Sequence, residues 1–309
     1  MLKTQKKYFQ ILLKLSSFFL IFVIIQYMYS NFMDNNIKNL NMYCISLEPS
    51  HLNFIKSLGY IPVGLGDKNF SNDWMKDDTG ANISAKNKNY GEYTFHYWVW
   101  KNYLDKMKSG WIGFCQYRKF WTLKQYDQTN LNIEKIPSMV INEIPKEYNN
   151  CDVILGKPFY INERKTSKFV KKGLNLIIKN PSVLFNKNQR NLKFHFDLMH
   201  GENNLSKAIN LLDEKNKNDF DNYMKTNFYF HPHNMFICKS KELLKSYYDV
   251  IFPWLERCET IFGFKNLKGY DLTRIYGFLA ERFLSYWFCK NSKTKTMNIT
   301  FYDINNDLK

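Results

Sequence analysis

Short apolar runs alternate with amphipathic segments along most of the chain. Apolar runs followed by turn residues predict buried strands at 43–47, 60–66, 111–116, 152–155, 227–239 and 294–302. Apolar residues at three- and four-residue spacing predict helices at 51–58, 90–108, 167–179, 241–258 and 271–290. Because strands alternate with helices, we expect an α/β fold with a mostly parallel sheet flanked by helices.

The N-terminal residues have a different pattern. Three lysines precede an apolar run of 19 residues, Ile11 to Tyr29, close to the ~20 that cross a bilayer as a helix. No small-residue cleavage site follows, which favours an uncleaved anchor over a signal peptide. The positive flank predicts a cytoplasmic N-terminus and a single-pass, type II membrane protein. We expect an anchor at 1–30, a polar stem at 31–41 and one folded domain at 42–309.

Two methionines leave another possibility open. Translation from Met33 or Met42 would produce a chain without this anchor. A mass measurement of the native protein would show whether translation starts at Met1, Met33 or Met42. The sequence also leaves open which compartment holds the domain.

Composition restricts the class of protein. The chain has 309 residues, 45% of them hydrophobic, which is enough for a core and excludes a disordered chain. Its mean hydropathy of -0.45 excludes a polytopic membrane protein. The six cysteines show no paired metal-site spacing, and Cys44, Cys115, Cys151 and Cys238 lie in apolar runs typical of buried thiols.

The formal net charge of +16 is unevenly distributed. Residues 157–193 contain ten basic side chains and one acidic one, a pattern of surfaces that bind phosphorylated molecules, acidic lipids or nucleic acids. A plain solvated surface explains the pattern equally well. Since zinc-finger spacing, aromatic RNA-binding signatures and helix-turn-helix patterns are absent from the sequence, we expect no nucleic-acid partner.

A strand that ends in cations is one candidate site. Tyr117, Arg118 and Lys119 directly follow the apolar run 111–116. Two cations at the carboxyl end of a strand suit a diphosphate, and arginine can bind it with two hydrogen bonds. The alternative is an ion pair with Asp77 or Asp78.

Three other segments contain polar groups that suit chemistry. The loop 77–84 offers carboxylates, hydroxyls and Gly80 for a sugar, a ribose or a metal, or it forms an Asx turn. His231 and His233 have a spacing that suits a metal, or they are structural. On the last long helix, Glu281 follows Arg274 and Gly277 on one face. Glu281 is either a base or an ion-pair partner of Arg274 or Arg118. Gly277 allows another group to approach the helix closely.

Taken together, these segments resemble a family of predicted glycosyltransferases common in capsular and exopolysaccharide gene clusters and catalogued as a domain of unknown function. The resemblance covers about 42–300 and is densest from Asp78 to Arg118. It is carried by Asp78-Thr79-Gly80, Asn82-Ile83-Ser84, Lys86-Asn87, Tyr90, Glu92, Thr94, Tyr97-Trp98, Trp100-Lys101-Asn102, Ile112-Gly113, Cys115, Tyr117-Arg118, 152–155, 234–237, Arg274, Gly277, Glu281-Arg282 and Trp287.

The resemblance implies a GT-A-like (Rossmann-like) fold and transfer of a sugar from a nucleotide-sugar donor to a glycan or lipid-linked acceptor. The implied catalytic residues are Glu281, as base or acceptor clamp, Asp78 and Arg118. The implied substrate-binding residues are Thr79, Gly80, Asn82, Tyr90, Glu92, Tyr117, Lys119, His200, Asn234, Arg274 and Arg282.

The chain departs from the family pattern at three positions. Ala81 replaces an acid, Gln116 replaces a histidine, and Asn204 replaces an acid after His200. Because no Asp-x-Asp motif follows a strand, a divalent cation (Mn or Mg) stays an open expectation, and Arg118 and Lys119 are expected to neutralise part of the diphosphate charge. The departures also leave open a rival function, a membrane-tethered carbohydrate- or phosphate-binding module without catalysis.

Overall fold

The computed structural model describes residues 39–307 except 109, 128, 130, 164–175 and 180. Contacts divide the chain into Met1–Asn39 and Leu40–Lys309, and the second unit contains the sheet and its helices. Its first strand includes Leu40 and Asn41, the last two residues of the expected stem. No helix in the described ranges is long and apolar enough to cross a membrane; the expected anchor, 1–30, lies outside them.

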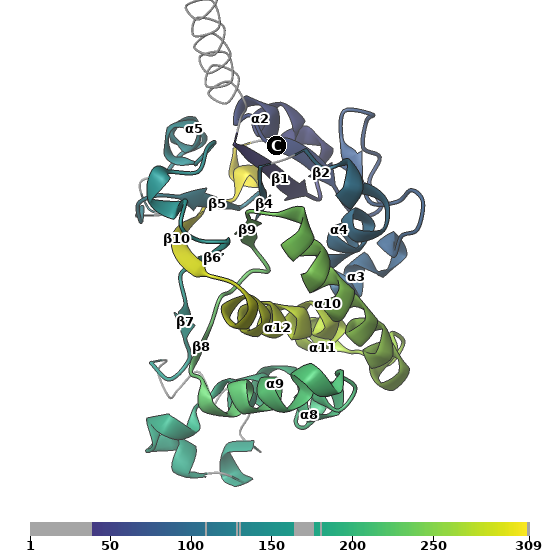
Figure 1. The fold of residues 1–309 in the computed structure, drawn as a ribbon, viewed down its shortest axis with the longest axis vertical. Coiled ribbons are helices and arrows are strands. Elements are labelled where there is room, and N and C mark those ends of the chain that lie inside the picture. Colours follow the sequence, from purple (N-terminus) through teal and green to yellow (C-terminus); the bar gives the residue numbers. More distant parts are fainter. Residues whose placement is uncertain are drawn as a thin grey trace, which may run out of the picture. The chain divides into compact units, whose positions relative to one another are not determined.

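A sheet of eight strands, in the order β3-β2-β1-β4-β5-β10-β6-β9, forms the centre of this unit (Figure 1). Its strands are β1 (Leu40–Ser46), β2 (Ile61–Gly64), β3 (Met75–Lys76), β4 (Trp111–Gln116), β5 (Lys119–Thr122), β6 (Val153–Gly156), β9 (Phe236–Cys238) and β10 (Thr294–Phe301). Two short strands, β7 (Phe159–Tyr160) and β8 (Tyr229–Phe230), form a separate antiparallel pair.

The sheet is mixed, so the expectation of a mostly parallel sheet was wrong. β1 runs parallel to β2 and β4, and β10 runs parallel to β6. β5 and β9 run antiparallel to their neighbours. The chain reverses at Tyr117 and Arg118, because Gln116 pairs directly with Lys119. Two residues can join antiparallel strands, and no glycine or asparagine marks this turn in the sequence.

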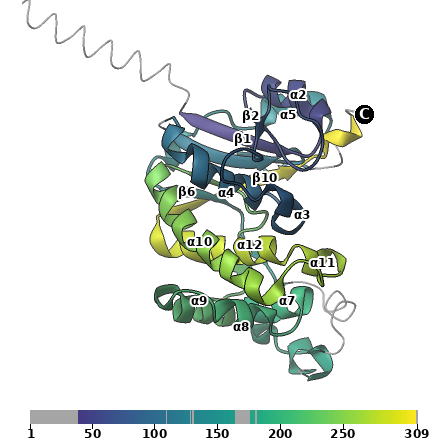
Figure 2. The ribbon, with the colours of Figure 1, turned by 90° about the vertical axis from the view of Figure 1, so that its right-hand side faces the viewer.

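Helices cover both faces of the sheet (Figure 2). Successive side chains of β1 alternate between two cores: Met42 and Cys44 belong to one, Tyr43 and Ile45 to the other. The first core includes α2 (Leu52–Ser57) and α5 (Ile136–Met139). The second includes side chains of α4 (Tyr93–Trp98), α10 (Lys241–Phe262) and α12 (Ile275–Asn291), beyond which lie α7 (Leu192–His200), α8 (Asn204–Ile209) and α9 (Glu214–Thr226).

Most of the predicted elements are confirmed, but three of them are interrupted. The expected helix 90–108 is split into α3 (Asn87–Tyr90), α4, a π-helical turn (Val99–Tyr103) and a 3-10 turn (Leu104–Lys106), with the first break at Gly91. The expected strand 227–239 is split into β8 and β9 around 231–235. The expected helix 271–290 is split at Arg274 into α11 (Gly269–Thr273) and α12.

Two further differences concern helices. The pattern did not predict α7, α8 and α9, although Asn191 and Asp213 cap α7 and α9 through their side chains. Of the expected helix 167–179, only 176–179 are described, and they are helical; the rest lies outside the described residues.

Candidate functional site

A pocket of about 210 Å³ opens beside the carboxyl ends of β1, β2 and β4. Ile45 and Leu47 line it from the end of β1, Leu65 follows β2, and the segment 116–119 follows β4. The remaining lining residues come from α3 and the turn after it, from the loop between β8 and β9, and from α11, α12 and the break between them: Asn87, Gly91, Glu92, His233, Asn234, Tyr270, Arg274, Gly277, Phe278 and Glu281.

The strand order explains why a pocket forms there. The chain leaves β1 for β2 on one side and later returns to the other side of β1 as β4. At such a reversal of strand order, the connections diverge and leave a crevice at the carboxyl ends of the strands, where ligands of open α/β sheets bind. The local topology therefore favours ligand binding between β1 and β4.

The turn between β4 and β5 contributes two cations to this pocket. The side chain of Arg118 is exposed and makes no ion pair with any residue that the structure describes. Burial lowers the pKa of Lys119, and the nearby Arg118 and Arg274 lower it further, while Glu92 and Glu281 oppose the shift. The alternative pairing with Asp77 or Asp78 is wrong, because neither carboxylate makes an ion pair with Arg118 or Lys119; Asp78 Oδ2 lies 3.9 Å from Lys76 Nζ.

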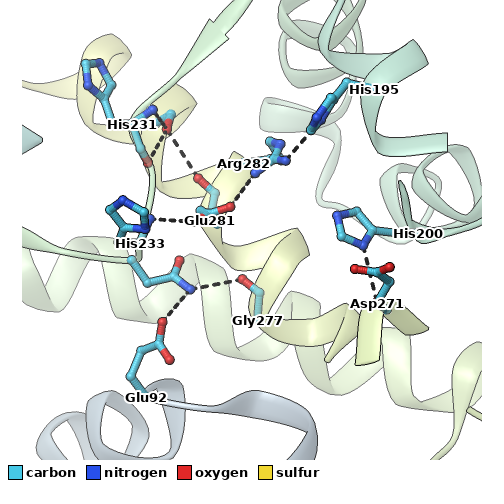
Figure 3. A network of polar contacts seen from close by, with 11 residues as sticks. Glu92, His195, His200, His231, His233, Asp271, Gly277, Glu281 and Arg282 are labelled. Atoms are coloured by element: carbon cyan, nitrogen blue, oxygen red, sulfur yellow. Dashed lines mark hydrogen bonds and ion pairs between the residues drawn. The ribbon is translucent and has the colours of Figure 1, made fainter. Parts of the chain in front are cut away.

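Glu92, Asn234 and Arg274 form a second group of polar side chains. Arg274 Nη2 lies 3.2 Å from Glu92 Oε2. Asn234 Nδ2 donates to Glu92 Oε1 at 2.9 Å, and Figure 3 draws this bond from the labelled Glu92. The same amide nitrogen donates to the carbonyl of Gly277 at 3.1 Å. Asn234 has a φ of 53°, which asparagine tolerates better than most residues. Glu92 lies between α3 and α4, Asn234 between β8 and β9, and Arg274 between α11 and α12, so these contacts join three interruptions of regular structure.

Glu281 projects from α12 into the same pocket. Its Oε1 accepts from the backbone N–H of His233 at 2.5 Å, and its Oε2 accepts from Arg282 Nη1 at 2.5 Å (Figure 3). The expected pairing of Glu281 with Arg274 or Arg118 is therefore wrong. Arg282 lies outside the pocket, fully buried, with its guanidinium 3.5 Å from the ring centre of Phe230. Burial lowers the pKa of Arg282, and Glu281 opposes that shift.

The described residues contain no cluster of protein ligands that would hold a metal ion without a substrate. No group of three or more histidine, cysteine or acidic side chains within the described ranges is placed to hold a metal ion. Both oxygens of Glu92 and of Glu281 already accept hydrogen bonds or ion pairs. His231 Nδ1 lies 2.7 Å from the carbonyl of Gly156, and burial with the nearby Lys119 lowers the pKa of His233 to about 3.

Several predicted site residues lie outside the pocket. Thr79 accepts from Trp98 Nε1 at 3.1 Å, and Asn82 accepts from the amide and hydroxyl of Ser84 in an Asx turn. Tyr90 is buried, stacks on Tyr276 at 4.8 Å and donates to Glu259 at 2.6 Å. The predicted site residues that do not line the pocket are Asp78, Thr79, Gly80, Asn82, Tyr90, His200 and Arg282.

The pocket also contains residues that the pattern did not single out. Gly91 has a φ of 59° and leaves room for the guanidinium of Arg274, a role that an isolated glycine in a helical pattern can signal. Leu47, Leu65, Tyr270 and Phe278 are apolar or aromatic lining residues with no distinguishing motif.

The close approach predicted at Gly277 is present, because a Cβ there would lie 3.3 Å from the carbonyl oxygen of Tyr90.

Comparisons with known proteins identify the family. The family model described as "Domain of unknown function (DUF4422)" matches residues 45–292. The chain belongs to this family. The matched segment of the DUF4422 protein includes every lining residue of the pocket, from Ile45 to Glu281. A search of curated proteins finds no match.

The fold of the DUF4422 protein is similar to a solved structure, "WbbM bifunctional glycosytransferase apo structure". The two are 20% identical with a TM-score of 0.59, over 85% of this chain and 45% of that chain. The similarity shows a shared mixed α/β fold. The DUF4422 protein spans less than half the length of the WbbM chain.

Proposed function

We propose that this DUF4422 protein is a glycosyltransferase that moves a sugar from a nucleotide-sugar donor to a glycan or lipid-linked acceptor. Two observations support this function: the fold resembles that of a glycosyltransferase, and the pocket lies where open α/β sheets bind their ligands. A GT-A-like active centre, an anchor at 1–30 and a membrane partner are part of the proposal.

The observation that carries the proposal is the pair of cations after β4. Arg118 and Lys119 lack ion-pair partners among the described residues, although both line a pocket with two carboxylates. An anion with several oxygens would compensate them, and the diphosphate of a nucleotide sugar has this chemistry. Their charge would also stabilise the diphosphate as it leaves.

Glu281 is the residue proposed to act on the acceptor. In the transfer, the bond from the sugar carbon to the donor phosphate breaks, a bond to the acceptor oxygen forms, and the hydroxyl proton must be removed. Glu281 faces the pocket, and the hydrogen bonds from His233 and Arg282 hold its carboxylate in one orientation. Glu92, Asn234 and Arg274 are proposed to bind hydroxyl groups of the transferred sugar.

A panel of UDP-, GDP- and CDP-sugars tests this function. Thermal shift identifies a donor that binds, and release of the nucleoside diphosphate then measures hydrolysis and transfer. Turnover of at least one donor supports the proposal. Failure of the full-length protein to bind any donor would contradict it.

A binding module without catalysis is the second candidate, and one observation favours it. Both oxygens of Glu281, and both of Glu92, accept hydrogen bonds or ion pairs from the protein. A carboxylate held in this way has fewer lone pairs available for a substrate proton. Donor binding with no hydrolysis or transfer would support this candidate over the glycosyltransferase.

A further inference from the structure

Two aromatic rings from α11 and α12 line the pocket. Tyr270 on α11 is 66% exposed, and Phe278 on α12 lies with its ring centre 5.9 Å from that of Tyr270. Both belong to the pocket, and the guanidinium of Arg274 lies 5.7 Å from the Tyr270 ring centre. We call Tyr270 and Phe278 the aromatic face.

His200 supports this face from behind. Its buried ring stacks on Phe278 with 4.1 Å between ring centres and 24° between planes. Its Nδ1 lies 3.2 Å from the carbonyl of Asp271, the residue after Tyr270 (Figure 3). One side chain of α7 therefore contacts both α11 and α12, which carry the two rings. This places His200 in contact with the aromatic face and outside the pocket.

We infer that the aromatic face stacks on a sugar ring of the acceptor and that His200 is a positioning residue for it. That this sugar is the second substrate of the transfer rests on the proposed function. The C–H groups of a pyranose carry partial positive charge and match the negative face of an aromatic ring. Asn87 also lines the pocket and offers an amide group for its hydroxyls.

The donor nucleoside has a separate place in the pocket. Ile45, Leu47 and Leu65 form an apolar wall at the ends of β1 and β2, beside the cations that follow β4. The strand-order reversal puts the nucleotide at this wall, because ligands of such sheets lie outside the strand ends. The aromatic face belongs to helices α11 and α12, which leaves it for the acceptor.

Titrations with two classes of probe test the inference. Methyl glycosides of glucose, galactose, mannose and N-acetylglucosamine probe the sugar site, and the UDP-, GDP- and CDP-sugars probe the donor site. The variants of the full-length protein are Tyr270→Ala, His200→Ala and His200→Asn, whose amide nitrogen takes the position of Nδ1 and can still donate to Asp271. Tyr160→Ala is the matched control, since Tyr160 is 44% exposed and lies outside the pocket.

We expect the wild type to bind at least one methyl glycoside and Tyr270→Ala to weaken that binding by about fivefold or more. Tyr160→Ala should leave it unchanged. His200→Ala should weaken glycoside binding with little effect on donor binding, and His200→Asn should recover part of it. A general loss of structure would instead weaken both classes of probe.

Three results would overturn the inference: no glycoside binds the wild type, Tyr270→Ala keeps wild-type glycoside affinity, or Tyr270→Ala weakens donor binding instead. The last result would assign the aromatic face to the nucleobase. The proposed function fails separately, when the wild type neither binds nor turns over a nucleotide sugar.

Discussion

The guanidinium of Arg274 occupies the space that a side chain at position 91 would need. Gly91 ends α3 with a φ of 59°, and the next residue, Glu92, pairs with Arg274 at 3.2 Å. The absence of a Cβ therefore allows α12 to place a cation against the start of α4. This contact joins two of the segments that line the pocket.

Gly91→Ala should separate the effect of this contact from ordinary backbone strain. An alanine in this sparsely populated backbone region costs of order 1–3 kcal/mol, and displacement of Arg274 adds about 1–3 kcal/mol for the lost charged hydrogen bond. Gly263→Ala is the control, because Gly263 has a φ of 54° and a Cβ added there would meet nothing within 4 Å. Urea denaturation should show the larger loss for Gly91→Ala. Equal losses in the two variants would contradict a packing role for Gly91.

Glu281→Gln should destabilise the fold as well as stop transfer. The amide oxygen of the new side chain would still accept from the His233 N–H, but the buried guanidinium of Arg282 would lose its compensating charge. Removal of one partner from a buried pair costs about 3–5 kcal/mol. Denaturation of Glu281→Gln measures this cost.

A double variant separates stability from activity. Glu281→Gln with Arg282→Met removes both charges, so most of the lost stability should return because no buried ion lacks a partner. Transfer should stay absent, since the carboxylate is still missing. Recovered transfer in the double variant would rule out a catalytic role for Glu281.

Acid should destabilise the protein through His233. Its pKa is lowered from the ordinary 6.5 to about 3, so below pH 6.5 the unfolded chain binds a proton that the folded protein does not. The free energy of unfolding should therefore fall as the pH decreases from about 6.5 toward 3, by up to about 1.4 kcal/mol per pH unit for this group.

His233→Asn isolates that contribution. Asparagine tolerates the φ of 81° found at this position and does not titrate. Between pH 6.5 and 4.5, the stability of the variant should fall less steeply than that of the wild type. The stability of the variant should still fall toward acid pH, because burial also lowers the pKa of His96 to about 3 and His96 is present in both proteins. Parallel curves would show that His233 is protonated normally in the folded state.

Hydrophobic pattern predicted the parts of the fold whose side chains are buried in a regular way. The strands β1, β2, β4, β6 and β10 and the helix α10 follow from apolar spacing alone. The pattern did not predict β5, because Tyr117 and Arg118 form the turn before it without a typical turn residue. It also missed α9, where only Asn216, Phe220 and Met224 are buried and the apolar stripe is too narrow to recognise.

The errors in predicting continuous elements coincide with the pocket. Gly91, His233, Asn234 and Arg274 each interrupt an element that was expected to be unbroken, and all four line it. A positive φ or a helix break costs stability, and such costs concentrate where a site needs a particular geometry. Glu281, Arg118 and Lys119 were predicted from residue type and position. The partner of Glu281 was missed, because the adjacent Arg282 turns inward to a buried position that no periodicity indicates.

Calorimetric titration of Arg118→Ala with a bound nucleotide sugar tests the central claim most directly. Lys207→Ala on α8 is the control, because it removes an exposed positive charge outside the pocket. If Arg118 binds the diphosphate, Arg118→Ala should weaken donor binding by about tenfold or more and abolish hydrolysis and transfer, with an unchanged circular dichroism spectrum. Lys207→Ala should match the wild type. Wild-type donor affinity and turnover in Arg118→Ala would contradict the account.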